Sequence, residues 1–313
     1  MWATFDPVDN YFYRLLSKRY AIELTEQPDF LIHSWSQFGS RYQQYSCVRI
    51  YYTGENERPD FTACDYAFSF DHLDDPRHYR LPLYVLYFDV GELVKTEFDP
   101  RVVLAEKTSF CNFIYSNPRC LKRNRFFQKL SKYKRVDSGG RFLNNIGGPV
   151  QDKAAFMRRY KFTIAFENQS AAGYTTEKLV EPMRVNSIPI YWGNPLVHLD
   201  FNARSFLNYH DAGSDEALIE RIIEVDRDDD LYFDYLRQPW LHGNQAPAAL
   251  SDESVLDRFE EIFAARITPV ALRRRSVQWA DNLRRLVTRR LPFRARQMVG
   301  TAIGRAVQAA ART

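Results

Sequence analysis

The chain has 313 residues, of which 45% are hydrophobic, 26% charged and 15% aromatic. This composition is typical of a folded globular protein and excludes a disordered or fibrous chain. No apolar run approaches the length of a transmembrane helix, and the start MWATFDPVDN lacks the basic and apolar parts of a secretory signal. Four cysteines without C-x-x-C spacing indicate neither a disulfide framework nor a zinc site. We therefore expect a folded protein in a reduced, cytoplasmic setting.

Charge is distributed unevenly along the chain. The formal net charge is +4, but residues 268–313 hold eleven Arg, no Lys and a single acid, Asp281. This segment therefore carries +10, and the preceding 267 residues sum to −6. A mildly acidic globule followed by a strongly basic tail indicates two different tasks.

Helical and strand patterns alternate from the N-terminus onward. A helix is predicted around Phe12, Leu15 and Leu16, and β-rich runs follow at 29–34, 48–53 and 66–71. A second series then begins, in which we expect a strand at 110–117, a helix at 121–133, a glycine-rich stretch at 138–148, a strand at 162–166, a helix at 175–185 and a strand at 187–192. Strands that alternate with helices are typical of parallel α/β sheets.

The stretch 160–197 reads as a strand, a polar loop with glycine, a helix and a second strand. Thr175 or Thr176 can cap the helix, and Glu177 falls in its first turn. The backbone amides at this helix start, together with Lys178, could bind a phosphate or diphosphate beyond the carboxyl ends of the strands. The alternative interpretation is an ordinary solvated helix start in which these charges only favour the helix dipole.

The same stretch closely resembles the signature of glycosyltransferase family ten, the α1,3/1,4-fucosyltransferases. The matching pieces are Tyr160-Lys161-Phe162, Phe166-Glu167-Asn168, Gly173-Tyr174, Thr176-Glu177-Lys178 and Ile188-Pro189-Ile190-Tyr191-Trp192-Gly193. A second block, from Tyr52 to Phe61 and then Asp65-Tyr66-Ala67, looks like the acceptor-domain motif of the bacterial members. A third is Ser116-Asn117-Pro118 with Arg123-Asn124.

The resemblance extends from about Tyr11 to about Asp211 and implies a GT-B fold, with two Rossmann-like domains that face a cleft. We accordingly expect an acceptor-binding domain at 1–105, a GDP-fucose-binding domain at 106–267 and a basic amphipathic helical tail at 268–313. The strand that precedes the first helix in the family is nearly absent here, which indicates either a short gene start or a reduced acceptor domain.

By the same resemblance, Glu55 is the catalytic base that activates an acceptor hydroxyl in an inverting displacement. The alternatives are that Glu57 takes this role, or that both are ordinary turn carboxylates. Arg123 and Lys178 match the cations that contact the departing diphosphate. Tyr174 and Glu177 match contacts to the nucleotide or sugar of GDP-fucose, and Asn168 is a weaker candidate for the same pocket.

GT-B enzymes generally work without a metal, so no metal or other cofactor is expected. The acidic run 226–230 could be mistaken for a metal site, but we interpret it as a solvated polar break. Tyr191 and Trp192 could line the site or belong to the core. No aromatic-interleaved basic groove is visible, so nucleic-acid binding is not expected.

The basic tail has the pattern of a cationic amphipathic helix. Trp279, Leu283, Leu286 and Val287 fall on one face, and arginines crowd the remainder. This pattern favours docking on the inner face of the cell membrane, although a helix packed on the protein is the alternative. The resemblance predicts fucose transfer from GDP-fucose to the GlcNAc of an N-acetyllactosamine-type surface glycan. The alternatives are another sugar-nucleotide donor or a non-catalytic membrane-surface binding protein.

Overall fold

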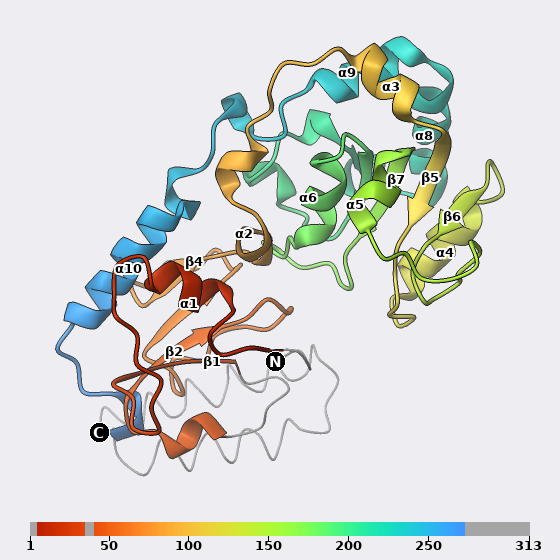
Figure 1. The fold of residues 1–313 in the computed structure, drawn as a ribbon. Helices are drawn as coiled ribbons and strands as arrows, with labels where there is room; N and C mark the ends of the chain where they lie inside the picture. The colour runs from red at the N-terminus through yellow and green to blue at the C-terminus, as the bar shows by residue number, and fades with distance from the viewer. Residues whose placement is uncertain (1–4, 35–40, 273–313) are drawn as a thin grey trace. The chain divides into compact units, whose positions relative to one another are not determined.

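The computed structural model describes residues 5–34 and 41–272. The chain divides into two compact units (Figure 1). The first unit contains the chain up to Ser69, Leu73–Arg80 and the chain from Val255 onward. The second unit contains Phe70–His72 and Leu81–Ser254. Each unit is built around its own parallel sheet and is described by itself.

The sheet of the first unit has four parallel strands in the order β1-β2-β3-β4. They are β1 (Phe30–His33), β2 (Val48–Tyr52), β3 (Tyr66–Ser69) and β4 (His78–Arg80). The first three confirm the predicted strands, whereas β4 is too short to be visible as a pattern. Helix α1 (Tyr11–Leu16) also falls where it was predicted, and Asn10 caps it by accepting a hydrogen bond from the Tyr13 amide.

Helix α10 (Asp252–Ala264) comes from the far end of the described chain and completes the core of this unit. The Phe259 ring stacks on Phe68 at a centroid distance of 4.8 Å and meets Phe12 edge-on at 6.0 Å. The Arg19 guanidinium lies 2.8 Å from the carboxylates of Asp257 and Glu260. The first unit is thus assembled from two segments that are remote in sequence.

A buried carboxylate fastens the chain after α10 to the sheet. Asp65 precedes β3, and it accepts hydrogen bonds from the Arg49 amide at 2.9 Å and the Val270 amide at 2.7 Å. The short 3₁₀ turn Val270–Leu272 is thereby tied to β2. Residues 273–313, including the predicted amphipathic helix, lie outside the described residues.

The sheet of the second unit has five parallel strands in the order β6-β5-β7-β8-β9. Their bounds are β5 (Ser109–Phe113), β6 (Val136–Ser138), β7 (Tyr160–Phe166), β8 (Ile188–Trp192) and β9 (Leu207–Asn208). The central strand β7 is buried along almost its whole length, as expected for a parallel strand with helices on both faces.

The helices of this unit are α2 (Leu83–Tyr87), α3 (Pro100–Glu106), α4 (Leu121–Leu130), α5 (Lys153–Arg158), α6 (Glu177–Met183), α7 (Tyr209–Ala212), α8 (Asp215–Arg227) and α9 (Asp229–Arg237). Alternate residues of β5, β7 and β8 join side chains of α4, α8 and α9 in the main core. Helices α5 and α6 pack against β7, and α6 also against β8. The predicted helices at 121–133 and 175–185 correspond to α4 and α6, which end earlier than expected.

The unit boundaries differ from the expected ones at 105 and 267. Residues 81–105 belong to the second unit because α2 lies beside α6 and α3 packs on α9. Residues 255–267 belong to the first unit because α10 fills its core. Sequence patterns reveal elements but not these long-range contacts.

The acidic run 226–230 is not simply solvated, which corrects the sequence interpretation. Asp226 is buried, accepts a hydrogen bond from the Tyr133 hydroxyl at 2.9 Å, and forms ion pairs with Lys134 and Lys161. Asp228 caps α9 by accepting a hydrogen bond from the Leu231 amide at 3.0 Å. The run therefore stabilises the junction of α8 and α9.

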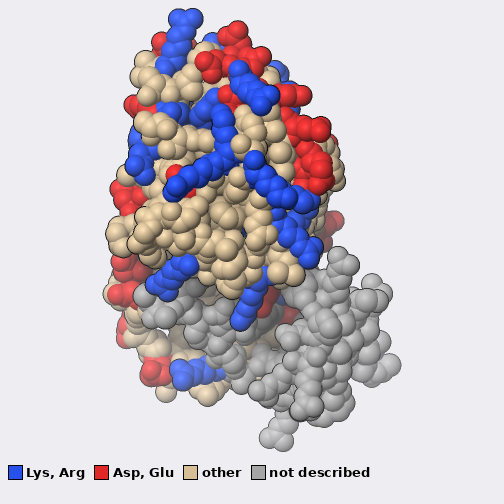
Figure 2. Space-filling view, turned by 90° about the vertical axis from the view of Figure 1, so that its right-hand side faces the viewer, with Lys and Arg blue, Asp and Glu red and all other residues tan. Residues whose placement is uncertain are grey.

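Helix α4 and the residues after it carry many cations, on the side of the molecule that Figure 2 shows. In that view Lys and Arg side chains are interspersed with Asp and Glu. Lys129 pairs with Asp215 at 2.7 Å, and Lys122 pairs with the same carboxylate at 3.5 Å. Acidic partners on α8 therefore offset part of the positive charge of α4.

Candidate functional site

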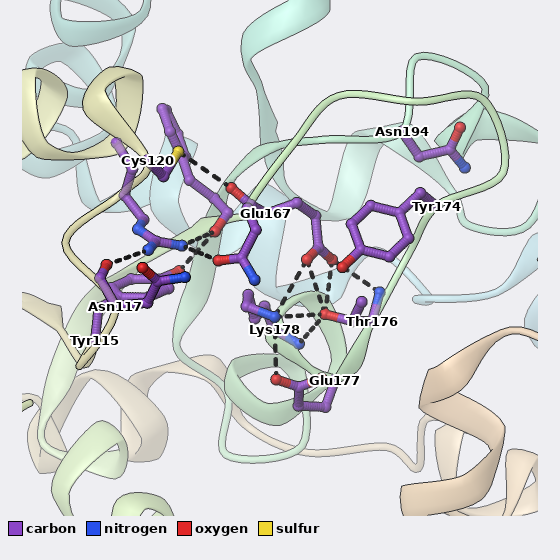
Figure 3. A network of polar contacts seen from close by, with 12 residues as sticks. Tyr115, Asn117, Cys120, Glu167, Tyr174, Thr176, Glu177, Lys178 and Asn194 are labelled. Carbon is purple, nitrogen blue, oxygen red and sulfur yellow. Dashed lines mark hydrogen bonds and ion pairs between the residues drawn. The ribbon is translucent and has the colours of Figure 1, made fainter. Parts of the chain in front are cut away.

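Polar residues gather where β5, β7 and β8 end. Tyr115 to Asn117 follow β5, Glu167 and Asn168 follow β7, and Gly193 and Asn194 follow β8. Because the strands are parallel, these ends lie along one edge of the sheet, where ligands bind in open α/β folds. Helix α6 begins at the same edge, so its first residues join this set (Figure 3).

The centre of the site is a buried carboxylate bound to the start of α6 (Figure 3). The Glu167 side chain is fully buried and accepts hydrogen bonds from the Thr176 amide at 2.8 Å and from the Thr176 hydroxyl at 2.8 and 2.9 Å. The Lys178 ammonium lies 3.3 Å from the Glu167 carboxylate and donates to the Thr176 hydroxyl oxygen at 2.9 Å. It also donates to Glu177 at 3.1 Å. One cation is thus shared by two carboxylates and one hydroxyl.

Burial and ion pairing set the protonation of these groups. Burial raises the pKa of Glu167, and the nearby Lys178 reduces this effect. Burial also acts to raise the pKa of Glu177, but the charge of Lys178 and the hydrogen bonds to the Glu177 carboxylate together outweigh it, and the pKa is lowered. Burial opposes the charged form of Lys178, yet the two carboxylates hold its pKa well above the usual value. Lys178 is therefore a fixed positive charge at neutral pH.

Arg123, on α4, forms a second cationic centre at the end of β7. Its side chain is fully buried and donates to the Phe166 carbonyl at 3.2 Å, to the Asn168 side-chain oxygen at 3.0 Å and to the Asn117 carbonyl at 2.9 Å. The guanidinium also lies 3.8 Å from the centre of the Tyr115 ring. Arg123 therefore holds the loops after β5 and β7 together and orients Asn168.

The loop between β7 and α6 is shaped by a glycine and an asparagine. Gly173 has a φ of 81°, and a Cβ at this position would lie 2.3 Å from the Phe70 carbonyl oxygen. Asn194 is fully buried and accepts from the Gly173 amide at 2.7 Å while donating to the Thr175 hydroxyl at 3.1 Å. These contacts fix the path of the loop that carries Tyr174 and Thr176.

The predicted donor-site residues all lie at this edge of the second unit. Asn168 is bound to Arg123, Glu177 is bound to Lys178, and Tyr174 is buried with its ring 5.1 Å from that of Phe70. Their contacts with a nucleotide stay predictions. Tyr191 is core: it is fully buried, and its hydroxyl accepts from the Asn194 amide at 2.9 Å.

Two amides at the start of α6 are not free for an anion, which corrects part of the sequence interpretation. The Thr176 amide is bound by Glu167, and the Lys178 amide is capped by the Thr176 hydroxyl. On α4, the Lys122 ammonium lies 3.5 Å from the centre of the Tyr209 ring and pairs with Asp215.

Glu55 lies in the first unit, in the loop that follows β2. Its amide donates to the Thr53 hydroxyl at 3.1 Å, and that hydroxyl in turn donates to the Glu55 carbonyl at 3.2 Å. The Glu55 side chain is exposed, whereas Glu57 is half-buried and its carboxylate accepts from the Tyr51 hydroxyl at 3.5 Å. The loop thus holds the Glu55 backbone and leaves its carboxylate accessible.

Sequence reasoning assigned no role to Glu167, Tyr115 or Asn194. The only available signal was position, because each follows directly or closely on a buried strand whose carboxyl end faces the site. A carboxylate immediately after a buried strand is costly unless it is paired, which would have singled out Glu167.

Comparison with known proteins identifies the family. The model of the alpha-(1,3)-fucosyltransferase FucT N-terminal domain matches residues 1–87, and the model of glycosyltransferase family 10 (fucosyltransferase) C-term matches residues 104–255. A crystal structure of an alpha1,3-fucosyltransferase is similar with a TM-score of 0.74 and 30% identity, over 84% of this chain and 86% of that one. The chain belongs to glycosyltransferase family 10. Its two α/β units with parallel sheets have the GT-B fold of this family, as predicted.

Other members of family 10 and further fucosyltransferases are similar over part of their length. The chain is 33% identical over 266 residues to the alpha-(1,3)-fucosyltransferase FucT of Helicobacter pylori, covering 72% of this chain and 55% of that protein. It is 31% identical over 189 residues to GDP-fucose protein O-fucosyltransferase 3 of Xenopus laevis, covering 54% of this chain and 39% of that protein. The chain thus spans about half or less of these curated relatives. A crystal structure of alpha1,3-fucosyltransferase with GDP-fucose matches with a TM-score of 0.70 and 29% identity, over 84% of this chain and 87% of that one.

No helix in the described part of the family 10 chain is long and apolar enough to cross a membrane. Within the same residues, no group of three or more His, Cys, Asp or Glu side chains is placed to hold a metal ion.

Proposed function

We propose that this chain is an inverting α1,3-fucosyltransferase that transfers L-fucose from GDP-fucose to a glycan hydroxyl. The observation that carries the proposal is a pair of cations at the carboxyl edge of the second sheet, the fully buried Arg123 and the partly exposed Lys178. They occur in a family 10 chain that is similar over most of its described length to an alpha1,3-fucosyltransferase with GDP-fucose.

In the proposed donor site, Lys178 stabilises the negative charge that develops on the departing diphosphate. Its ammonium is fixed by Glu167, Thr176 and Glu177, so little reorganisation is needed as GDP leaves. Arg123 supports the same region, since it orients Asn168 and the loop after β5. Tyr174 and Glu177 complete the proposed contacts with the nucleotide or the sugar. Positive charge from side chains can replace a metal here, so we expect a metal-independent reaction with no cofactor.

In the proposed reaction the Glu55 carboxylate accepts the proton of the acceptor hydroxyl. The hydroxyl oxygen forms a bond to the anomeric carbon while the bond from that carbon to the GDP oxygen breaks, so the configuration inverts. The exposed Glu55 side chain on a fixed loop backbone supports this role. Glu57 is the less suitable base because its carboxylate already accepts from Tyr51.

For the acceptor we propose the GlcNAc of an N-acetyllactosamine-type surface glycan. We also propose a location on the inner, cytoplasmic face of the cell membrane. The basis for the location is the sequence of the basic tail, which contains eleven Arg and a single acid. Binding to vesicles with and without anionic lipid, by the full chain and by a chain ending at residue 272, tests it. Equal binding of both chains would contradict a role for the tail.

The deciding experiment is transfer from GDP-fucose to N-acetyllactosamine and to lacto-N-biose in the presence of EDTA, with the product linkage determined by NMR. Product on N-acetyllactosamine alone, with α1,3 linkage, is the expected result. Panels of GDP-mannose and UDP-sugars test the donor, and loss of activity in EDTA would contradict metal independence. Binding of GDP without any transfer would refute the acceptor assignment.

A matched pair of variants tests the base. Glu55→Gln should abolish transfer and leave GDP binding unchanged, because it removes only the proton acceptor. Glu57→Gln makes the same chemical change two residues away and should retain most of the activity. If Glu55→Gln still turns over at the normal rate, Glu55 is not the base.

A further inference from the structure

The buried pair of Glu167 and Thr176 contacts no reacting group in the proposed mechanism, which uses the two residues only as partners of Lys178. Glu167 directly follows the central strand β7, and Thr176 is the N-cap of α6. Three contacts of 2.8–2.9 Å join the carboxylate to the amide and hydroxyl of Thr176. The residue at the end of the strand is therefore bound directly to the residue that starts the helix (Figure 3).

The Thr176 hydroxyl is the hub of these contacts. It donates its single hydrogen to Glu167 and accepts from the Lys178 ammonium at 2.9 Å. Its oxygen also caps the Lys178 amide. The hydroxyl bridges the carboxylate and the ammonium, which are themselves 3.3 Å apart. The position of Lys178 is thus set by a neutral group as well as by charge.

A fully buried carboxylate is costly unless hydrogen bonds and an opposite charge compensate it. Here the Thr176 amide and hydroxyl supply the hydrogen bonds, and Lys178 supplies the charge. Gly193 leaves the necessary space, because a Cβ at that position would lie 2.4 Å from Cγ of Glu167. Three separate elements, the ends of β7 and β8 and the start of α6, therefore converge on this carboxylate.

We propose that Glu167 and Thr176 act together as positioning residues that hold the Lys178 ammonium in place for the diphosphate of the donor. The proposal rests on the proposed function, since it assigns Lys178 to the diphosphate. Without the hydroxyl, the Lys178 ammonium would lose one of its three oxygen partners and would be held less firmly. Thr176 thereby helps to hold Lys178 in place for the ligand.

Thr176→Val is the most direct test, because it removes the hydroxyl without changing the net charge. We expect the Kd for GDP and the KM for GDP-fucose to rise roughly tenfold or more, the value of one hydrogen bond to a charged group. Because Lys178 is also proposed to stabilise the charge that develops as GDP leaves, kcat should fall as well. Thr176→Ser keeps the hydroxyl and should restore all three constants to near the wild-type values.

Ser214→Ala is the matched control for the lost helix cap. Ser214 caps α8 by accepting a hydrogen bond from the Ala217 amide at 3.1 Å, outside the site. Both substitutions remove one capping hydroxyl, and Thr176→Val also removes a hydrogen bond to the buried Glu167 carboxylate, so Thr176→Val should lower stability more. Only Thr176→Val should change GDP binding. An equal change of GDP affinity in Ser214→Ala would show that general destabilisation is responsible and would overturn the proposal.

A double-mutant cycle with Glu167→Gln tests whether the two residues act as one unit. If they do, Thr176→Val should weaken GDP binding much less in the Glu167→Gln background than in the wild type. Full additivity would overturn the proposal, as would unchanged GDP binding by Thr176→Val. This failure is distinct from failure of the proposed function, in which the wild-type chain itself would neither bind GDP nor transfer fucose.

Discussion

Replacement of Arg123 by methionine should destabilise the second unit strongly. The guanidinium is fully buried, donates three hydrogen bonds and lies on the Tyr115 ring. Each hydrogen bond to a charged group contributes ~1.5–3 kcal/mol, and a desolvated cation–π contact contributes ~2 kcal/mol. Methionine carries no charge, so the variant no longer incurs the cost of burying a guanidinium, and this offsets part of the lost contact energy. Two of the three acceptors would still be hydrogen-bonded in the variant. The Phe166 carbonyl still accepts from the Tyr115 hydroxyl, and the partly exposed Asn168 side chain can bind water.

The net loss is therefore about 3 kcal/mol, which corresponds to a decrease in Tm of roughly 6–12 °C for a unit of this size. Arg125→Met is the matched control on the same helix, because Arg125 is exposed and should cost less than ~0.5 kcal/mol. Thermal unfolding of both variants by circular dichroism gives the comparison. If Arg123→Met melts within ~2 °C of Arg125→Met, the buried contacts do not hold the loops as described.

Three further predictions concern stability. Gly173→Ala should lower the free energy of unfolding by more than ~3 kcal/mol, because the new Cβ clashes and φ is unfavourable. Gly213→Ala is the control: φ is 78° but the space is open, so the loss should be only ~1 kcal/mol. Equal denaturation midpoints of the two variants would show that the clash does not occur. Burial lowers the pKa of Lys95 to about 7, so between pH 7 and 9 the unfolded chain binds more protons and stability should rise with pH. Relative to Lys95→Met, the rise should be about 2 kcal/mol in urea titrations, and a constant difference would contradict it. Asp226→Asn removes the charge that Lys134 and Lys161 share and should lower the free energy of unfolding by ~2–3 kcal/mol. Asp230→Asn, at an exposed position, should leave stability unchanged. Similar Tm values for the two variants would be evidence against the buried ion pairs.

The elements that the sequence revealed are those with strong local patterns. Strands such as β7 and β8 are long apolar runs, and α4 and α6 follow clear turn signals. The strands β4, β6 and β9 have only two or three residues each, too few for a periodic pattern. Such short strands exist because neighbouring strands provide their hydrogen bonds.

The candidate site was predictable in its location but not in its internal contacts. The motif placed Lys178 and Glu177 at the start of a helix, and the structure has them there. The burial of Arg123 and the pairing of Glu167 with Thr176 depend on strands and helices that are far apart in sequence. The sequence alone does not indicate whether a charged side chain contacts a ligand or another part of its own chain.

The discontinuous first unit has a consequence for the order of folding during synthesis. Its helix α10 leaves the ribosome only after the whole of the second unit has been made. The second unit can therefore fold first, while the aromatic face around Phe12 and Phe68 remains uncovered until Phe259 arrives. During this interval the nascent chain exposes an apolar surface, and a chaperone that binds such surfaces would encounter the sheet of the first unit rather than that of the second.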